Sequence, residues 1–135
     1  MKKSISFLDK TFWITESKDN PKHVASLQIL EMPEGAAPDY VENLVLELRK
    51  FSTATSPFNM VVKTFMGFFP LWLKSVDKLD MEYHVQVVYV EDVSDRLKLH
   101  KVVARLHEPQ LDRNKPLWQY VVIKGKHGNT FAIYT

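Results

Sequence analysis

Apolar residues recur at helical spacing in two long stretches of the chain. The first follows Asp39, a residue type that caps helices, and Glu42 lies three positions later, as in a capping box. Its apolar positions fall at i, i+3, i+4 and i+7, which places them on one side of a helix. They are Val41, Leu44, Val45 and Leu48. This pattern predicts a helix that ends near Phe51.

The second helical stretch begins near Ser94, which is a favourable N-cap residue. It continues to about Leu106, and Pro109 marks its end because proline cannot continue a helix. Its apolar stripe consists of Leu99, Val102, Val103 and Leu106. A shorter segment, Ser6 to Ser17, places Leu8 and Phe12 on one helical face. It predicts a short helix or an irregular packed segment.

Alternation of apolar and polar positions predicts strands elsewhere. Residues 23–30 and 83–90 both alternate with period two. Residues 117–124 and 130–135 flank a loop with two glycines, Gly125 to Asn129, as in a β-hairpin. The order of helices and strands predicts a mixed α/β fold, with antiparallel pairing at least in this hairpin.

The first strand of the predicted hairpin is apolar on both faces. One face carries Trp118, Tyr120 and Val122, and the other carries Leu117, Val121 and Ile123. A strand of this kind belongs in the middle of a layered structure. Since nothing follows Thr135, we expect part of this surface to lack a cover within the chain.

The densest aromatic stretch, Phe65 to Leu73, lies within an apolar segment that starts at Met60. Lys63 and Pro70 interrupt this segment, which is also shorter than the ~18 apolar residues needed to span a bilayer. Two interpretations remain. Exposed aromatic residues would enter the headgroup region of a membrane, whereas packed ones would belong to a core or line a tunnel. The sequence favours packing without deciding the question.

Composition removes several functional classes. With 45% hydrophobic and 25% charged residues, the 135-residue chain is long enough for one compact domain with a core. Its net charge of +2 arises from interspersed charges without a basic block, so no nucleic-acid partner is expected. The absence of cysteine excludes disulfides and thiolate catalysis. Lys2 and Lys3 precede no apolar core of a signal peptide, which favours a cytoplasmic protein.

No catalytic motif that can be recognised in isolation is present. The chain contains no His-Glu-x-x-His pattern, no Gly-x-Ser-x-Gly elbow and no glycine-rich phosphate loop. His100 and His107 could share a helical face, but they lack a third ligand, so no metal site is expected. His84 is expected to be a sheet residue with a local hydrogen bond, and His127 an exposed turn residue.

Several short motifs nevertheless follow one another in a characteristic order. They are Leu8-Asp9-x-x-Phe12, the block from Asn20 to Val24, the block from Leu79 to Val85, and the block from Leu111 to Trp118. This order resembles that of the bacterial wax ester synthase/diacylglycerol acyltransferase family over nearly the whole chain. The most specific part is Pro116-Leu117-Trp118 followed by a hairpin.

The resemblance implies a chloramphenicol acetyltransferase-like fold, in which two similar α/β halves enclose a tunnel that holds the active site. Residues 1–135 would form the N-terminal part of the acyltransferase domain, incomplete at its C-terminus. The family's His-His-x-x-x-Asp-Gly motif would begin just after Thr135. The chain would therefore contain no catalytic residue, would be inactive alone, and would need the remaining C-terminal part of the same protein as its partner.

The reaction implied by the resemblance is transfer of a fatty acyl group from acyl-CoA to a long-chain alcohol or diacylglycerol. In this family the second histidine of the motif is regarded as the base that deprotonates the acceptor hydroxyl. An imidazole that titrates near neutral pH is suited to that task. Acyl-CoA would be a co-substrate, and no metal or redox cofactor would be required.

Five residues match family blocks that are expected to lie near the substrates. Pro116, Leu117 and Trp118 would shape the wall of the site, although Trp118 could equally pack the sheet. His23 matches the block leading into the first strand, and Phe12 matches the N-terminal motif. For His23 a positional role is favoured over a role in the tunnel.

The chain departs from the family between Phe58 and Leu73, where relatives commonly carry a more polar stretch with arginine. Contact with a membrane or lipid droplet through Phe65, Phe68, Phe69 and Trp72 is one consequence to consider. Two alternatives to the acyltransferase remain open. One is a non-catalytic lipid-binding or interaction domain, and the other is a condensation-type acyltransferase of the same fold.

Overall fold

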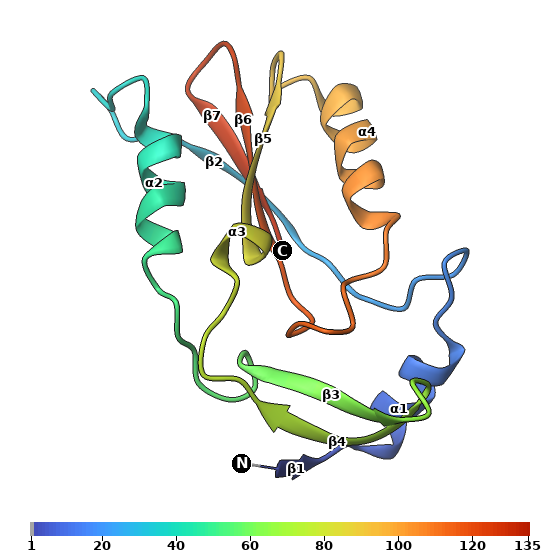
Figure 1. Ribbon diagram of the computed structural model, residues 1–135. Helices are drawn as coiled ribbons and strands as arrows, with labels where there is room; N and C mark the ends of the chain where they lie inside the picture. Colours follow the sequence, from blue (N-terminus) through green and yellow to red (C-terminus); the bar gives the residue numbers. More distant parts are fainter. Residues whose placement is uncertain (1) are drawn as a thin grey trace. The chain divides into compact units, whose positions relative to one another are not determined.

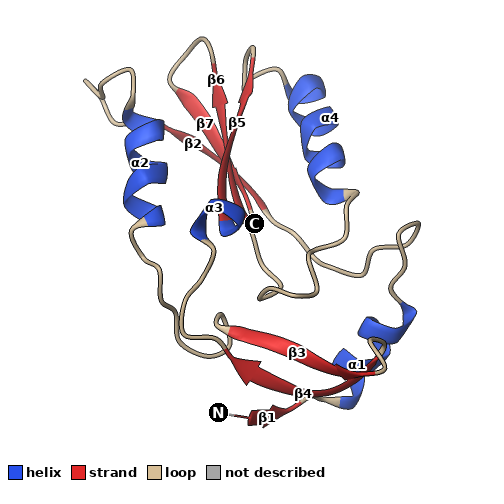
Figure 2. Cartoon of the chain, in the orientation of Figure 1, coloured by secondary structure: helices blue, strands red, loops and turns tan. Residues whose placement is uncertain are grey.

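The computed structural model describes residues 2–135, which form helices and strands in mixed order (Figures 1 and 2). The chain divides into two compact units, and each unit is assembled from three separate segments. We call them the first unit and the second unit. The first unit comprises residues up to 24, 53–79 and 108–118. The second unit comprises residues 25–52, 80–107 and 119–135.

A four-stranded sheet in the order β2-β7-β6-β5 forms the centre of the second unit. Its strands are β2 (Leu27–Glu31), β5 (Val85–Val90), β6 (Tyr120–Gly125) and β7 (Thr130–Tyr134). β6 and β7 form the predicted antiparallel hairpin, and β2 pairs antiparallel with β7. β5 runs parallel to β6, which requires a crossover connection between them. The sheet therefore contains both parallel and antiparallel pairs, and it confirms the antiparallel pairing predicted for the hairpin.

Two helices cover the two faces of this sheet (Figure 1). Leu99 of α4 (Arg96–His107) packs with Val121 and Ile123 of β6. Val41 and Val45 of α2 (Tyr40–Arg49) pack on the other face, in a cluster with Val122. The expectation that the two-faced apolar strand would lack a cover is therefore wrong for Val121, Val122 and Ile123. All three are buried, because the stripes of α4 and α2 supply a core on each face.

The first unit contains an antiparallel sheet in the order β1-β4-β3 and one helix, α1 (Phe7–Thr15). Its strands are β1 (Lys2–Ser4), β3 (Met60–Phe65) and β4 (Phe69–Ser75). Ser6 caps α1 by accepting a hydrogen bond from the Asp9 backbone N–H at 3.1 Å. Trp13 is the buried residue of α1, and its indole N–H donates to the carbonyl of Phe68 at 2.8 Å.

The hairpin between β3 and β4 contains a β-bulge. Lys63 pairs with Trp72, but the next residue, Thr64, pairs with Pro70, so Leu71 is an extra residue in β4. The turn itself passes through Met66 and Gly67, which have φ angles of 54° and 74°. Only the turn glycine adopts this left-handed conformation without steric cost, and Met66 is a strained neighbour.

The helix expectations are confirmed in kind, although their ends differ. The segment near residues 6–17 is a helix, but Leu8 and Phe12 are exposed and Trp13 is buried instead. Asp39 makes no capping hydrogen bond through its side chain. The second long helix starts at Arg96 rather than Ser94. The side chain of Asp95 accepts from the Lys98 N–H, while Ser94 bonds to Asp92.

The observed strands also begin or end at other residues than predicted. The strand predicted for residues 23–30 begins later and ends one residue further on, at Leu27–Glu31. His84 is not a sheet residue, because Met81–His84 forms a short helix, α3, that Asp80 caps before β5 begins. β6 starts at Tyr120, three residues later than expected. β1, β3 and β4 were not predicted as strands.

Candidate functional site

The end of β7 lies inside the sheet of the second unit, with a neighbouring strand on each side. Thr135 follows β7 and exchanges two backbone hydrogen bonds with Ser26, at 3.0 and 2.8 Å. Their hydroxyls are also in contact, with Oγ of Ser26 2.7 Å from Oγ1 of Thr135. On the other side, Tyr134 pairs with Val121 of β6. A residue joined to Thr135 would therefore leave the sheet between the starts of β2 and β6.

Polar side chains gather at this same edge of the sheet. Because β5 and β6 are parallel, both strands begin at the edge where β7 ends. His84 directly precedes β5, and Gln119 directly precedes β6. We define the β7 exit edge as Ser26, His84, Gln119 and Thr135.

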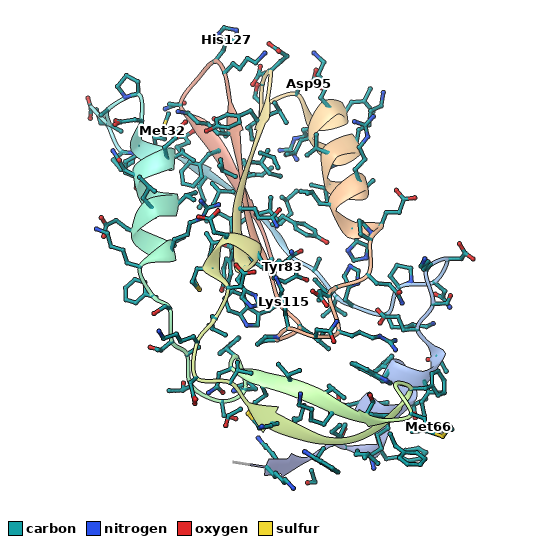
Figure 3. All side chains as sticks on the ribbon, in the orientation of Figure 1. Met32, Met66, Tyr83, Asp95, Lys115 and His127 are labelled. Carbon is teal, nitrogen blue, oxygen red and sulfur yellow. The ribbon has the colours of Figure 1, made fainter. Side chains whose placement is uncertain are left out.

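Hydrogen bonds to one carbonyl fix part of the β7 exit edge. The side-chain amides of Gln86 and Gln119 both donate to the carbonyl of Tyr83, each at 3.2 Å. The Tyr83 ring meets the imidazole of His84 edge-on, with centroids 5.1 Å apart, and Figure 3 shows Tyr83 at α3. His84 is fully buried. The amide of Gln119 and the buried imidazole of His84 are therefore positioned by the start of β5, whereas Ser26 and Thr135 position each other's hydroxyls.

Arg49 joins α2 to the same edge. Its Nε donates to the carbonyl of Val85 at 2.9 Å, and Nη1 lies 3.5 Å from the Glu82 carboxylate. The Val85 carbonyl belongs to the first residue of β5. The guanidinium thus fixes the beginning of β5 through its hydrogen bond. Its ion pair with Glu82 contributes little, because the Glu82 side chain is 84% exposed to solvent.

The block from Leu111 to Trp118 is fixed within the first unit. Asp112 forms an Asx turn, because its carboxylate accepts from the Asn114 backbone N–H at 2.9 Å. Arg113 then reaches α1, donating to the Trp13 carbonyl at 2.9 Å and to Glu16 at 3.0 Å. Its guanidinium also stacks over the Trp13 ring at 4.1 Å. The block is therefore anchored on α1 before it reaches the proline.

The expected wall residues differ in their surroundings. Pro116 is buried, whereas Leu117 is exposed. The Trp118 indole N–H donates to the Phe58 carbonyl at 2.7 Å, and the two rings are perpendicular with centroids 6.4 Å apart. Trp118 thus has a packing role in the first unit, and a substrate contact by these three residues stays a prediction.

The remaining two candidate residues lie in the first unit without a role that the structure assigns. Phe12 is on α1 and its side chain is 48% exposed. His23 is partly buried in the segment that precedes β2. A contact of either residue with substrate stays a prediction.

A partly buried polar network in the second unit could not be inferred from the sequence. Lys124 donates to both carboxylate oxygens of Glu42, at 2.9 and 2.7 Å, and to the Pro38 carbonyl at 2.6 Å. The Tyr89 hydroxyl donates to Glu42 at 3.1 Å. Burial alone would raise the pKa of Glu42, but the hydrogen bonds from Lys124 and Tyr89 outweigh it and lower this pKa. Glu42 thus ties α2 to the sheet instead of completing a capping box.

His107 has a defined contact as well. Its Nδ1 lies 2.7 Å from the hydroxyl of Tyr134, which connects the end of α4 to β7. Burial raises the pKa of Tyr134. Which group donates in this contact depends on the tautomer of the imidazole. No local sequence pattern pairs these two residues, because they meet only when α4 packs on the sheet.

Positive charge gathers in a shallow hollow at the opposite end of the same sheet. The hollow has a volume of about 350 Å³ and lies between the end of β5, α4 and the β6–β7 turn. Its charged lining residues are Lys98, Lys101, Arg105, Lys126 and Glu91. Hydrogen bonding to Lys126 holds the pKa of Glu91 below its ordinary value. Since the hollow lies where β5 ends, it is separate from the β7 exit edge.

Neither a metal site nor a membrane-spanning helix occurs in the described part of the chain. Within residues 2–135, no three or more histidine, aspartate or glutamate side chains are grouped so as to hold a metal ion. None of the helices in this range is long and apolar enough to cross a bilayer.

The fold of the chain is similar to that of a solved protein. A solved wax ester synthase/diacylglycerol acyltransferase from Marinobacter aquaeolei VT8 superposes with a TM-score of 0.86 at 30% sequence identity. The match covers 98% of this chain and 32% of that protein. The chloramphenicol acetyltransferase-like fold class inferred from the resemblance is confirmed by this likeness.

Relatives of similar sequence are named as O-acyltransferases. A probable diacylglycerol O-acyltransferase of Mycobacterium tuberculosis is 31% identical over 129 residues, covering 94% of this chain. The O-acyltransferase WSD of Acinetobacter baylyi is 29% identical over 128 residues. The chain spans only 28% and 27% of the length of these two relatives. The model of the wax ester synthase/diacylglycerol acyltransferase catalytic domain matches residues 5–135. The chain therefore belongs to the wax ester synthase/diacylglycerol acyltransferase family.

Proposed function

We propose that the protein containing this chain transfers a fatty acyl group from acyl-CoA to a long-chain alcohol or a diacylglycerol. The observation that carries the proposal is the family match over residues 5–135. The fold likeness to the Marinobacter enzyme over 98% of the chain supports it independently. The product would be a wax ester or a triacylglycerol, and the thiol of CoA would leave with the proton of the acceptor hydroxyl.

In this proposal the chain supplies scaffold and wall, and the catalytic base lies beyond Thr135. The motif His-His-x-x-x-Asp-Gly would follow the β7 exit edge, where Ser26 and Thr135 bracket the departing backbone. His84 and Gln119 would then lie beside the base and fix the positions of the groups around it. An oriented imidazole takes a proton faster than a free one because its geometry is already set. Acyl-CoA is a co-substrate here, and no metal or redox cofactor enters the proposed reaction.

The proposed substrate contacts are Pro116, Leu117, Trp118, His23 and Phe12. Of these, Phe12 and Leu117 have exposed side chains, which could meet a substrate without rearrangement. Trp118 is the sharpest case to test, because its packing on Phe58 gives it a competing structural role.

The test is an acyl-transfer assay on the full-length protein. Palmitoyl-CoA is supplied with hexadecanol in one arm and with a diacylglycerol in the other, and both CoA release and lipid product are measured. Release of CoA with formation of an ester is expected in at least one arm. If neither acceptor leads to ester formation, the acyltransferase proposal fails.

A variant of the full-length protein separates the two roles of Trp118. Substituting Trp118→Leu removes the indole that donates to Phe58 and any contact with substrate. A substrate contact predicts a raised KM for acyl-CoA or acceptor. A purely structural role predicts a lower melting temperature with KM unchanged. Leu97→Ala is the control, because Leu97 is 67% exposed and is not among the proposed substrate contacts.

Proposed lipid contact belongs to the same function, since both product classes are water-insoluble. We place it on Phe65, Phe68, Phe69 and Trp72, in a protein that works in the cytoplasm and at a lipid surface. The three phenylalanines are exposed. This exposure also favours the second candidate function, a non-catalytic lipid-binding or interaction domain. The assay above discriminates between them, because a binding domain consumes no thioester.

A further inference from the structure

One face of the small sheet in the first unit carries lysines at one end and aromatic rings at the other. β3 alternates regularly, so Lys63 and Phe65 lie on the same face. Directly opposed residues share a face, which adds Trp72 opposite Lys63 and Phe69 opposite Phe65. The bulge at Leu71 is what allows Phe69 and Trp72, three residues apart, to face the same way.

The lysine end extends across all three strands. Lys74 of β4 is directly opposite Lys2 of β1, and Trp72 is opposite both Ser4 and Lys63. The Lys2 ammonium lies 4.6 Å above the Trp72 ring. Within residues 2–135, no carboxylate forms an ion pair with Lys2, Lys63 or Lys74. Like charges placed directly opposite each other destabilise a sheet, so this arrangement calls for an anionic partner.

The aromatic end is the tip of the β3–β4 hairpin. Phe65 and Phe69 are 57% and 53% exposed, and Met66 in the turn is 83% exposed. Phe68 packs edge-on against Phe69 with ring centroids 5.1 Å apart. Figure 3 shows Met66 projecting from the end of the hairpin. Large apolar side chains exposed together in this way mark a contact surface.

The spacing of the two ends matches the depth profile of a membrane surface. Two residues of a strand span roughly 7 Å, so the Lys63 row lies about that far behind the phenylalanines. The row of Lys2 and Lys74 lies roughly 13 Å behind them. Apolar groups of interfacial proteins enter about 5–10 Å into the headgroup and acyl boundary. Aromatic rings at that depth place the lysines at the level of the lipid phosphates.

The first unit, which carries this face, has a net positive charge, as the lysine end of the face does. The first unit contains ten lysines and arginines and six acidic residues. The second unit contains eight basic and ten acidic residues. The first unit is therefore basic although the net charge of the whole chain is small, and an anionic surface would attract this unit.

We propose that the face formed by Lys2, Lys63, Lys74, Trp72, Phe65 and Phe69 docks on an anionic lipid surface. The hairpin tip enters the boundary between headgroups and acyl chains, and the lysines contact the phosphates. This inference rests on the lipid contact proposed above and adds the lipid charge and the orientation of the sheet.

The experiment measures binding of the full-length protein to vesicles by cosedimentation. One set of vesicles contains phosphatidylcholine alone, and the other contains about one third phosphatidylglycerol. Lys63→Gln/Lys74→Gln should weaken binding to the anionic vesicles roughly 30-fold at low salt, since each lysine contributes about 1 kcal/mol and 1.4 kcal/mol is tenfold. The effect should shrink as salt is raised. Phe65→Ala/Phe69→Ala should weaken binding to both vesicles by roughly tenfold or more.

Matched controls come from exposed residues of the second unit. Lys98→Gln/Lys101→Gln changes the net charge equally, and Phe51→Ala/Leu97→Ala removes two other exposed apolar side chains. Both control pairs should bind vesicles like the wild type. Unchanged binding of the two test pairs, equal losses in the controls, or no preference for anionic vesicles would each overturn the proposal.

Two further readouts keep the outcome unambiguous. If the rest of the protein covers this face, Phe65→Ala/Phe69→Ala will lower the melting temperature with vesicle binding unchanged, which also refutes docking. Acyl transfer is measured separately with detergent-dispersed substrates, where all four variants should retain activity. A protein that binds anionic vesicles through this face but forms no ester would refute the acyltransferase proposal alone.

Discussion

Arg113 shows how one side chain can fix a long irregular segment. It contributes a hydrogen bond to the Trp13 carbonyl, a charged hydrogen bond to Glu16 and a stacked position over the Trp13 ring. Glu16 in turn accepts from the Lys22 backbone N–H at 3.2 Å. A planar guanidinium can make all of these contacts at once, and an ammonium cannot.

Replacing Arg113 by lysine should therefore destabilise the first unit although the charge is kept. We expect Arg113→Lys to lower the free energy of unfolding by about 1–2 kcal/mol, from the lost stacking and one lost hydrogen bond. Thermal unfolding of the full-length protein, followed by tryptophan fluorescence, measures the change. Lys18→Arg is the control at an exposed position. A melting curve of Arg113→Lys that coincides with the wild type would contradict this account.

Lys124 and Glu42 give a prediction about pH. Lys124→Met leaves a half-buried carboxylate without its main partner, so it should cost about 1–2 kcal/mol at pH 7. The folded state lowers the pKa of Glu42 from 4.5, so this stabilisation is present above the pKa of the unfolded state and is lost as pH falls through the folded pKa.

Denaturant titrations of both proteins at several pH values check this expectation. The difference in unfolding free energy between wild type and Lys124→Met should be largest near neutral pH and shrink below about pH 4.5. In a Glu42→Gln background the same substitution should show no such pH dependence. A difference that stays constant down to pH 3 would mean that Glu42 is not the titrating partner.

At the scale of single residues, the sequence indicated which side chains were candidates for a role, but not which partners they contact. Asp39 and Glu42 have the spacing of a capping box, but the carboxylate of Glu42 bonds to Lys124, which lies 82 residues away in sequence. Such a partner cannot be inferred from local spacing, because only the completed sheet brings the two together. For the same reason Trp13, and not Leu8 or Phe12, turned out to be the buried residue of α1.

Among the elements, the β6–β7 hairpin has the tightest backbone requirement. Gly125 ends β6, and a Cβ at this position would lie 2.9 Å from the His127 carbonyl oxygen and 3.4 Å from the Val93 backbone nitrogen. The contact with the His127 carbonyl oxygen is too short for a real Cβ, and because the oxygen is a backbone atom it cannot be relieved by a side-chain rotation. The hairpin turn therefore folds back over residue 125 only because this residue is glycine.

Gly125→Ala should consequently destabilise the second unit by about 1–3 kcal/mol, which is the range for forced overpacking. The expected result is a lower melting temperature and weaker amide protection of β6 and β7 in hydrogen exchange. Asn129→Ala, in the same turn but exposed, is the control and should behave like the wild type. Equal stability of the two variants would show that the turn can move aside.

The periodicity of the sequence was a good guide to elements with one buried face. The stripes of α2 and α4 and the β6–β7 hairpin are confirmed, since a helix or strand on a core must repeat its apolar residues at the matching period. The β3–β4 hairpin was not predicted. Its bulge shifts the alternation at Leu71, so a strict period of two separates Phe69 from Trp72, although both lie on one face.

For the whole molecule, the chain crosses between its two units five times. Each unit is therefore built from segments that are distant in sequence, and neither can be obtained as one contiguous piece of the chain. Linear patterns indicated the α/β class, and the resemblance identified the family. They could not show the β7 exit edge, because its residues meet only in the completed sheet. The pairing of β2 with β7 brings Ser26 to Thr135, and the parallel pairing of β5 with β6 brings His84 and Gln119 to the same end.

Residues 1–135 alone are expected to show no acyl transfer. The proposed base would follow Thr135, and without a base in reach of the acceptor hydroxyl the thioester should not be attacked. CoA release from palmitoyl-CoA with hexadecanol measures this, and the full-length protein serves as the positive control. Ester formation by the 135-residue chain would show that the base lies within it.

The position of β2 at the outer edge of the four-stranded sheet affects how the isolated chain should behave in solution. An outer strand leaves a row of backbone donors and acceptors unpaired, and proteins usually protect such a strand with lysine or proline. Leu27–Glu31 contains neither, and Ile29 and Leu30 are 44% and 37% exposed. The strand that brackets Thr135 is thus a template to which another strand can add, either from a longer chain or, in concentrated samples, from a second molecule.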